Sequence, residues 1–116
     1  MKYSMFIGRW QPWHEGHRWL IDQRLNQQKN VLICIREVSA DDSNPYNPIE
    51  VKKNIESELD DLISSKRVKV VIIPDIESIN YGRGVGYKIE EIVLSEEIQK
   101  ISATKIRAKM REEGKL

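Results

Sequence analysis

Apolar residues occur along the chain in short runs that alternate with longer segments of mixed polarity. Three runs are short and mostly apolar, as buried strands are: Tyr3–Ile7, Val31–Ile35 and Val68–Ile73. Val31–Ile35 is apolar throughout and contains β-branched residues, which suits a strand covered on both faces, as in a parallel sheet. Between them, apolar side chains recur at helical spacing, which predicts helices over His17–Gln28 and from Pro48 to about Ser65. Asn47 precedes Pro48 as an N-cap residue, and Glu50 follows it by three, so the second helix has a clear start signal.

The segment after the third run predicts a loop, a short helix, a short strand and a final helix. These elements are Pro74–Tyr87, a helix with Ile89, Ile92 and Val93 on one face, a fourth strand over Ile98–Ile101, and a helix capped by Ser102 that ends at Gly114. The alternation of strands and helices over residues 1–116 predicts one α/β domain with a parallel sheet and right-handed crossovers. Ligands of such sheets bind beyond the carboxyl ends of the strands, where the loops Gly8–Gly16, Glu37–Asn47 and Pro74–Tyr87 should lie.

Composition narrows the classes of function. A net charge of +1, with 19 basic and 18 acidic residues, is a poor match to proteins that grip nucleic acid through many phosphate contacts. The sequence contains no apolar stretch of membrane-spanning length and no signal-peptide layout at its start. The single cysteine, Cys34, excludes an intramolecular disulfide and fits a reducing compartment, so we expect a cytoplasmic protein without membrane or nucleic-acid partners.

The loop Gly8–His17 carries the clearest chemistry. Its sequence is Gly-Arg-Trp-Gln-Pro-Trp-His-Glu-Gly-His, with His14 and His17 at the step from a strand loop into a helix. Imidazole donors, helix N-terminal amides and the helix dipole could together form an anion site there, and Gly16 would let a large group approach the backbone. Two alternatives stay open from the residues alone: the histidines could be metal ligands or ordinary surface residues.

This loop resembles the G-R-F-Q-P-F-H-x-G-H signature of the nucleotidylyltransferase superfamily. The family's second signature, I-S-S-T-x-I-R, is similar to Ile101-Ser102-Ala103-Thr104-Lys105-Ile106-Arg107. Together the two motifs imply the family's Rossmann-like three-layer sandwich over almost the whole chain. They also imply an enzyme in which an acceptor attacks the α-phosphorus of an NTP and pyrophosphate leaves, by positioning and charge stabilisation alone.

The resemblance assigns roles to individual residues. His14, His17 and Arg107 would be catalytic, with Arg9 and Arg107 clamping the triphosphate as planar forks. The nucleotide-binding residues it implies are Gly8, Arg9, Trp10, Gly16, Ser102, Thr104, Lys105 and Arg107. Mg²⁺ would be carried by the nucleotide phosphates, so no dedicated metal site is expected. The resemblance further implies a homodimer.

The resemblance specifies the two substrates, the nucleotide donor and the molecule that accepts the NMP group, less closely. Tryptophans stand at positions 10 and 13, where the family has phenylalanines. Ala103 replaces a serine of the second signature, Ile101–Arg107, which we call the late motif. Within the family that the motifs resemble, chains of this size occur among cytidylyltransferases, so the resemblance implies transfer of CMP to a small phosphorylated acceptor. The segments Gly8–Trp13 and Asn44–Glu50 favour instead the archaeal-type nicotinamide mononucleotide adenylyltransferases, which use ATP and which Asn44–Glu50 resembles.

Three further hypotheses stay open. Tyr81 and Arg83, in the glycine-rich loop, would bind the acceptor, although a turn without a role fits this segment equally well. A non-catalytic nucleotide-binding module would keep the same phosphate pocket. A small metal-binding protein would use His14 and His17 as ligands.

Overall fold

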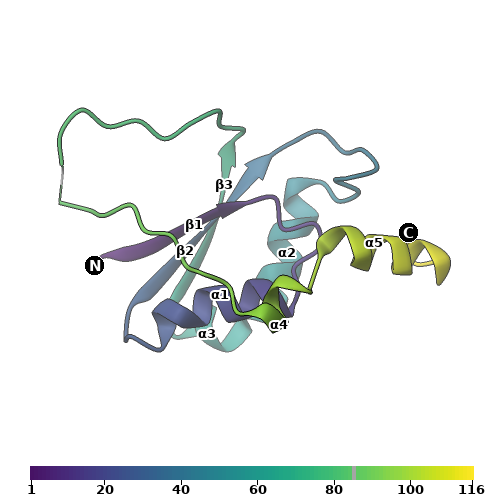
Figure 1. Cartoon of the computed structure of the whole chain (residues 1–116), viewed down its shortest axis with the longest axis horizontal. Helices are drawn as coiled ribbons and strands as arrows, with labels where there is room; N and C mark the ends of the chain where they lie inside the picture. The colour runs from purple at the N-terminus through teal and green to yellow at the C-terminus, as the bar shows by residue number, and fades with distance from the viewer. Residues whose placement is uncertain (85) are drawn as a thin grey trace.

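The computed structural model describes residues 1–84 and 86–116 and is built on a parallel three-stranded sheet in the order β1-β2-β3 (Figure 1). The strands are Tyr3–Gly8 (β1), Asn30–Glu37 (β2) and Val68–Pro74 (β3). Ile33 of β2 lies opposite Phe6 of β1 and Val70 of β3, which sets the register of the sheet. The α/β class, the parallel sheet and the three central predicted strands are therefore confirmed.

Helices connect the strands. Helix α1 spans Glu15–Leu25, and α2 (Pro48–Glu58) is followed by the short α3 (Asp60–Ser64). The cap predicted at Asn47 is present, because its side-chain oxygen accepts a hydrogen bond from the Glu50 amide at 2.9 Å. The single helix predicted to about Ser65 is interrupted at Leu59, whose φ and ψ of −111° and 25° leave the helical region.

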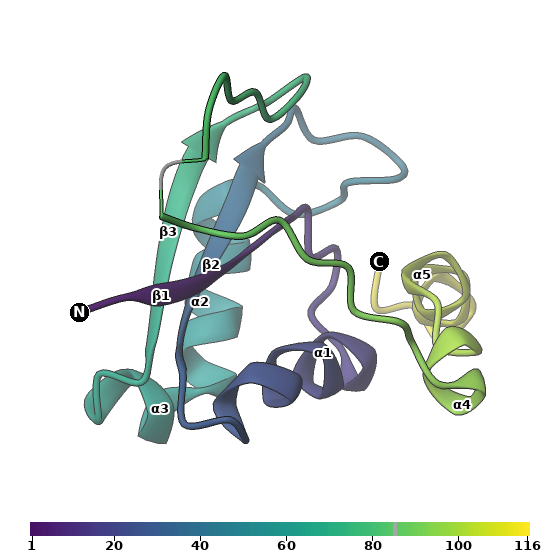
Figure 2. The same cartoon turned by 60° about the vertical axis from the view of Figure 1, so that its left-hand side comes forward.

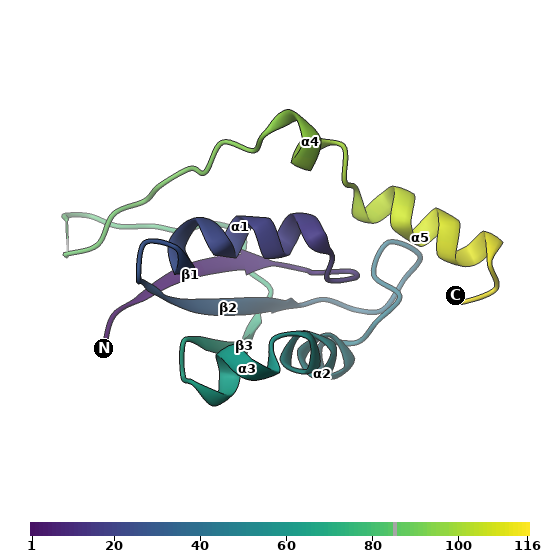
Figure 3. The ribbon, with the colours of Figure 1, turned by 90° about the horizontal axis from the view of Figure 1, so that it is seen from below.

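The core lies on one face of the sheet. Strand residues of this face pack with apolar residues of α1 and α2 in one cluster, which includes Val31, Ile33, Ile35, Val68 and Val70 from the strands and Ile21, Leu25, Val51 and Ile55 from the helices. In Figure 3 the three helices α1, α2 and α3 lie in front of the strands, and the chain after β3 runs faint behind them. Two right-handed crossovers that step in the same direction place both helices on the same face.

The predicted three-layer sandwich is therefore not complete in the part of the chain that the structure describes. Here one helical layer covers one face, and no described helix packs on the other. A second helical layer requires the chain to pair a further strand beyond β1, and no such strand follows among the described residues. The fourth strand predicted at Ile98–Ile101 is wrong, because Ser95 caps the short helix α4 (Glu96–Gln99) there.

The segment between β3 and α4 has no helix or strand in its described residues, 75–84 and 86–94. The predicted loop at Pro74–Tyr87 is thus longer than expected, and the helix predicted around Ile89, Ile92 and Val93 is wrong. Ile89 and Val93 are 61% and 79% exposed, so no apolar helix face is buried. Their β-branched side chains also disfavour a helix. An ion pair joins this segment to α1, between Arg24 Nη2 and Glu90 Oε2 at 2.7 Å.

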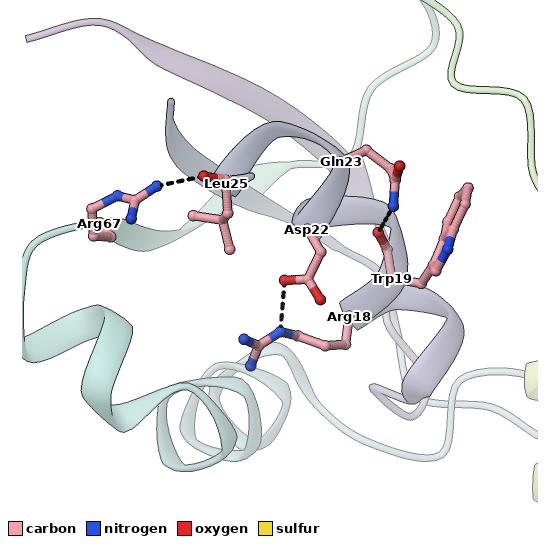
Figure 4. A network of polar contacts seen from close by, with 6 residues as sticks. All are labelled: Arg18, Trp19, Asp22, Gln23, Leu25 and Arg67. Atoms are coloured by element: carbon pink, nitrogen blue, oxygen red, sulfur yellow. Dashed lines mark hydrogen bonds and ion pairs between the residues drawn. The ribbon is translucent and has the colours of Figure 1, made fainter. Parts of the chain in front are cut away.

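Polar contacts hold α1 in place at its C-terminal end (Figure 4). Arg67, just before β3, donates from Nη2 to the Leu25 carbonyl at 2.9 Å, and Arg18 pairs with Asp22 on the helix surface.

Helices α4 and α5 (Ala103–Glu112) lie on the side of α1 away from α2 (Figure 2). The final helix is confirmed, with the predicted cap at Ser102.

Among the described residues, no helix combines the length and the apolar character needed to cross a membrane.

Candidate active site

The loop between β1 and α1 is supported from below by Trp10. Its indole is 6% exposed and donates from Nε1 to the Cys34 carbonyl at 3.0 Å, so it belongs to the core. A Cβ at Gly8 would lie 2.9 Å from this ring, which explains the glycine at that position. The edge of the indole packs against the His17 ring at 4.8 Å between centroids. Trp10 and Gly8, which the resemblance assigns to nucleotide binding, shape the loop that carries the histidines.

His14 and His17 form a reciprocal cap at the start of α1. His14 Nδ1 accepts hydrogen bonds from the Gly16 and His17 amides at 3.0 and 3.4 Å, and His17 Nδ1 accepts from the His14 amide at 3.2 Å. The two rings stack with centroids 3.6 Å apart. The helix begins at Glu15, two residues before the predicted start, because His14 is the N-cap. Two amides that were expected to bind an anion are therefore occupied by His14.

The cap determines which ring nitrogen of each histidine carries the proton. An Nδ1 that accepts a hydrogen bond carries no proton, so the proton of each neutral ring lies on Nε2. Burial lowers the pKa of His14, and burial together with the neighbouring His14 ring lowers the pKa of His17 to about 3. Both imidazoles are consequently neutral at pH 7 and present two adjacent Nε2–H donors.

Gly16 brings the two ends of the chain together. A Cβ at this position would lie 2.8 Å from His14 Cε1 and 3.6 Å from the Ile101 Cβ. The space beside its backbone is thus filled by the His14 ring, not left open for a ligand as the sequence suggested. The contact with Ile101 places the start of the late motif directly beside the histidine pair.

Gln11 joins three segments and was missed by the sequence analysis. Its side chain donates to the Tyr46 carbonyl at 2.8 Å and accepts from the Tyr46 amide at 3.0 Å. Its own carbonyl accepts from Arg107 Nη1 at 2.6 Å. The loops after β1 and β2 and helix α5 therefore meet at Gln11, which is 4% exposed. Its place inside the Gly8–His17 motif was the available signal.

Arg107 faces inward from α5. It is 9% exposed, and its Nη2 contacts Thr104 Oγ1 at 3.4 Å in addition to the bond to Gln11. The guanidinium thus has a structural task in docking α5, beside any contact with a triphosphate. Ser102 Oγ accepts from the Lys105 amide at 3.4 Å, while Thr104 and Lys105 are exposed on the first turn.

Three further predicted site residues, Arg9, Tyr81 and Arg83, lie outside the cluster formed by the histidines, Gln11 and Arg107. Hydrogen bonds from the main chain and side chain of Asn44 lower the pKa of Asp41, and the charge of Arg9, which is exposed in the histidine loop, adds a smaller effect of the same sign. The acceptor residues predicted at Tyr81 and Arg83 are not brought to the histidines. Their segment turns at the left of Figure 1, whereas the histidine loop and α5 lie at the right.

The donors gathered at the loop suit an anion better than a metal. Nδ1 of both histidines is engaged, and the described residues contain no group of three or more His, Cys, Asp or Glu that could hold a metal ion. A metal site based on His14 and His17 would therefore lack the further protein ligands that such sites use.

No protein-family model matches the chain, and no curated protein matches it significantly.

Replacing Gln11 with Ala should lower the free energy of unfolding by about 2–3 kcal/mol, because the amide and carbonyl of Tyr46 would lose their partner. Urea titration measures the change. Gln23→Ala is the matched control: it removes a glutamine whose side chain donates to the Trp19 carbonyl one turn earlier in α1, and should change stability by less than about 0.5 kcal/mol. Equal effects of both substitutions would contradict the central role of Gln11.

Acidification should destabilise the fold through His17. Its pKa near 3 lies below the unfolded value of 6.5, so the unfolded chain binds more protons between these limits. The stabilisation is complete above pH 6.5 and falls with pH, by about 2 kcal/mol at about pH 5. Urea midpoints at about pH 7.5 and 5 should therefore differ more in the wild type than in His17→Asn, which keeps an acceptor near Nδ1 but does not titrate. The same pH dependence in both proteins would rule out His17 as its source.

Proposed function

We propose that the chain is a nucleotidylyltransferase of the H-x-G-H type with a Rossmann-like fold. It transfers an NMP group, with CMP favoured, from an NTP to a small phosphorylated acceptor and releases pyrophosphate. The observation that carries the proposal is the reciprocal cap, which leaves the Nε2–H groups of His14 and His17 as adjacent donors beside the late motif.

The chemistry needs donors at the phosphates rather than a nucleophilic side chain. An acceptor phosphate oxygen attacks the α-phosphorus in line while the bond to the bridging oxygen breaks, and the electron pair leaves with pyrophosphate. Negative charge therefore grows on the bridging oxygen, where the two Nε2–H groups would donate. Since neither imidazole needs to change protonation state, both stay preorganised through the step.

Helix α5 would hold the far end of the triphosphate. Its first turn offers the exposed Thr104 and Lys105 side chains beside the N-terminal end of the helix dipole, which favours anions. Arg107 would act mainly by fixing α5 to Gln11, and Arg9, exposed beside the loop, would contact phosphate directly. Mg²⁺ enters this scheme as part of the Mg–NTP substrate, where it neutralises phosphate charge.

The donor nucleotide is the least constrained part of the proposal. Within the family that the two motifs resemble, the short length of this chain favours CTP as the donor. The segment Asn44–Glu50 favours ATP. A panel of CTP and ATP, each crossed with phosphorylated acceptors and scored by pyrophosphate release, separates the two. Binding of an NTP without pyrophosphate from any pair would make the chain a nucleotide-binding module instead.

His17→Asn should lower kcat by roughly 10²–10³, with a much smaller change in nucleotide Kd, because the lost Nε2 donor acts mainly as charge develops. His17→Ala removes both this donor and the Nδ1 acceptor of the cap. It should show the same loss of kcat and a further loss of stability of about 1 kcal/mol. Pyrophosphate release, nucleotide Kd and urea midpoints of both variants separate catalysis from capping. An unchanged kcat in His17→Asn and in the parallel variant His14→Asn would contradict the proposed roles.

A further inference from the structure

A hollow lies between the start of α1 and the end of α2. Its volume is about 330 Å³, and it is lined by Trp13, His14, Glu15, Arg18, Glu58 and Leu59. Ligand pockets begin at roughly 300 Å³, so a small molecule fits this space. Helix α5 lies on the side of α1 away from α2 (Figure 2), so the hollow and the late motif are on different sides of α1. The hollow is therefore not the surface that would hold the triphosphate.

Two of the lining side chains are large and apolar. Trp13 is half-buried, and its ring packs against those of Trp10 and His17, with centroids 5.5 and 5.4 Å apart. Leu59, at the end of α2, is 2% exposed and adds a rigid apolar surface. Because the face of an indole attracts positive charge, a tryptophan held in this way is a preorganised contact for a cation.

The charges around the hollow also favour a cation. Glu15 and Glu58 supply two carboxylates, and neither takes part in an ion pair in the described part of the chain. Arg18 carries the opposing charge, but its Nε lies 2.9 Å from Asp22 Oδ1 (Figure 4). His14 is neutral at pH 7, because burial lowers its pKa. The last turn of α2 has no basic residue, so the negative end of its dipole adds to the two carboxylates.

This combination suits an organic cation better than a metal ion. The described residues contain no group of three or more His, Cys, Asp or Glu that could hold a metal, and His14 Nδ1 is engaged in the helix cap. A metal ion would also gain nothing from Trp13 and Leu59. An alkylammonium ion has an apolar surface and a single positive charge, which match the indole and the carboxylates respectively.

We propose that this hollow binds a small alkylammonium cation, with Trp13 against its methyl or methylene groups and with Glu15 and Glu58 balancing its charge. The inference goes beyond nucleotidyl transfer and does not depend on it, because these three residues have no role in the proposed reaction. A chain without transferase activity could still bind the cation, and a transferase could lack this site.

Tetramethylammonium chloride is the probe, titrated at constant ionic strength with NaCl as the balancing salt. ¹H–¹⁵N spectra report on the hollow through the Trp13 indole N–H and the Leu59 amide. Both signals should shift to saturation with a Kd of about 10 mM or tighter, which is well within the limit for a ligand of this size. tert-Butanol, a neutral molecule of similar shape, should bind at least tenfold more weakly because it lacks the charge.

Variants test the named contacts. Glu15→Gln and Glu58→Gln should each weaken binding about two- to fivefold, as expected for an exposed ion pair, and the double variant by roughly tenfold. Glu56→Gln is the matched control: it removes a carboxylate from α2 that does not line the hollow, and should bind like the wild type. Trp13→Leu keeps an apolar side chain but removes the ring, and should weaken binding about two- to fivefold, measured at the Leu59 amide.

No saturable shift up to about 100 mM tetramethylammonium, roughly ten times the expected Kd, would overturn the proposal. Binding of tert-butanol with equal affinity would overturn it too, since the hollow would then select for apolar surface and not for charge. Equal weakening by Glu56→Gln would likewise show that only the general charge of the surface matters. Circular dichroism establishes that each variant is folded, and should Trp13→Leu fail to fold, the glutamate variants decide the outcome.

Discussion

The two hydrogen bonds between the Gln11 side chain and the Tyr46 main chain hold together the loops that follow β1 and β2. The Gln11 carbonyl extends this junction to α5 by accepting from Arg107. Each of these contacts is buried or partly buried, where an unmade hydrogen bond is costly. The junction therefore helps to keep the histidine loop beside α5, and the proposed chemistry depends on this arrangement.

The histidine pair changes which hydrogen-bond donors the N-terminus of α1 leaves free. Helix N-termini commonly bind phosphate through their own amides. Here His14 Nδ1 accepts hydrogen bonds from the Gly16 and His17 amides, so the donors that the two rings leave for a ligand are their Nε2–H groups. The donors lie further from the backbone and have a defined orientation, which the stacked rings and the Trp10 indole keep in place.

The sequence was informative where structure is set locally. Apolar runs predicted β1, β2 and β3, and the caps at Asn47 and Ser102 were visible because a cap involves neighbours in the chain. The Gln11 junction could not be predicted, since its partners lie 35 and 96 residues away. The helix predicted around Ile89 failed for a related reason: helical spacing of apolar residues predicts a face, but only tertiary contacts can bury it.

The most direct test of the account is the protonation of His14 and His17 in solution. Long-range ¹H–¹⁵N correlation spectra at pH 7 report which ring nitrogen carries the proton. We expect both rings to be neutral with the proton on Nε2, and both Nε2–H signals to shift when Mg–CTP or Mg–ATP is added. Rings protonated on Nδ1, or Nε2–H signals that neither nucleotide moves, would contradict a phosphate site built from the reciprocal cap.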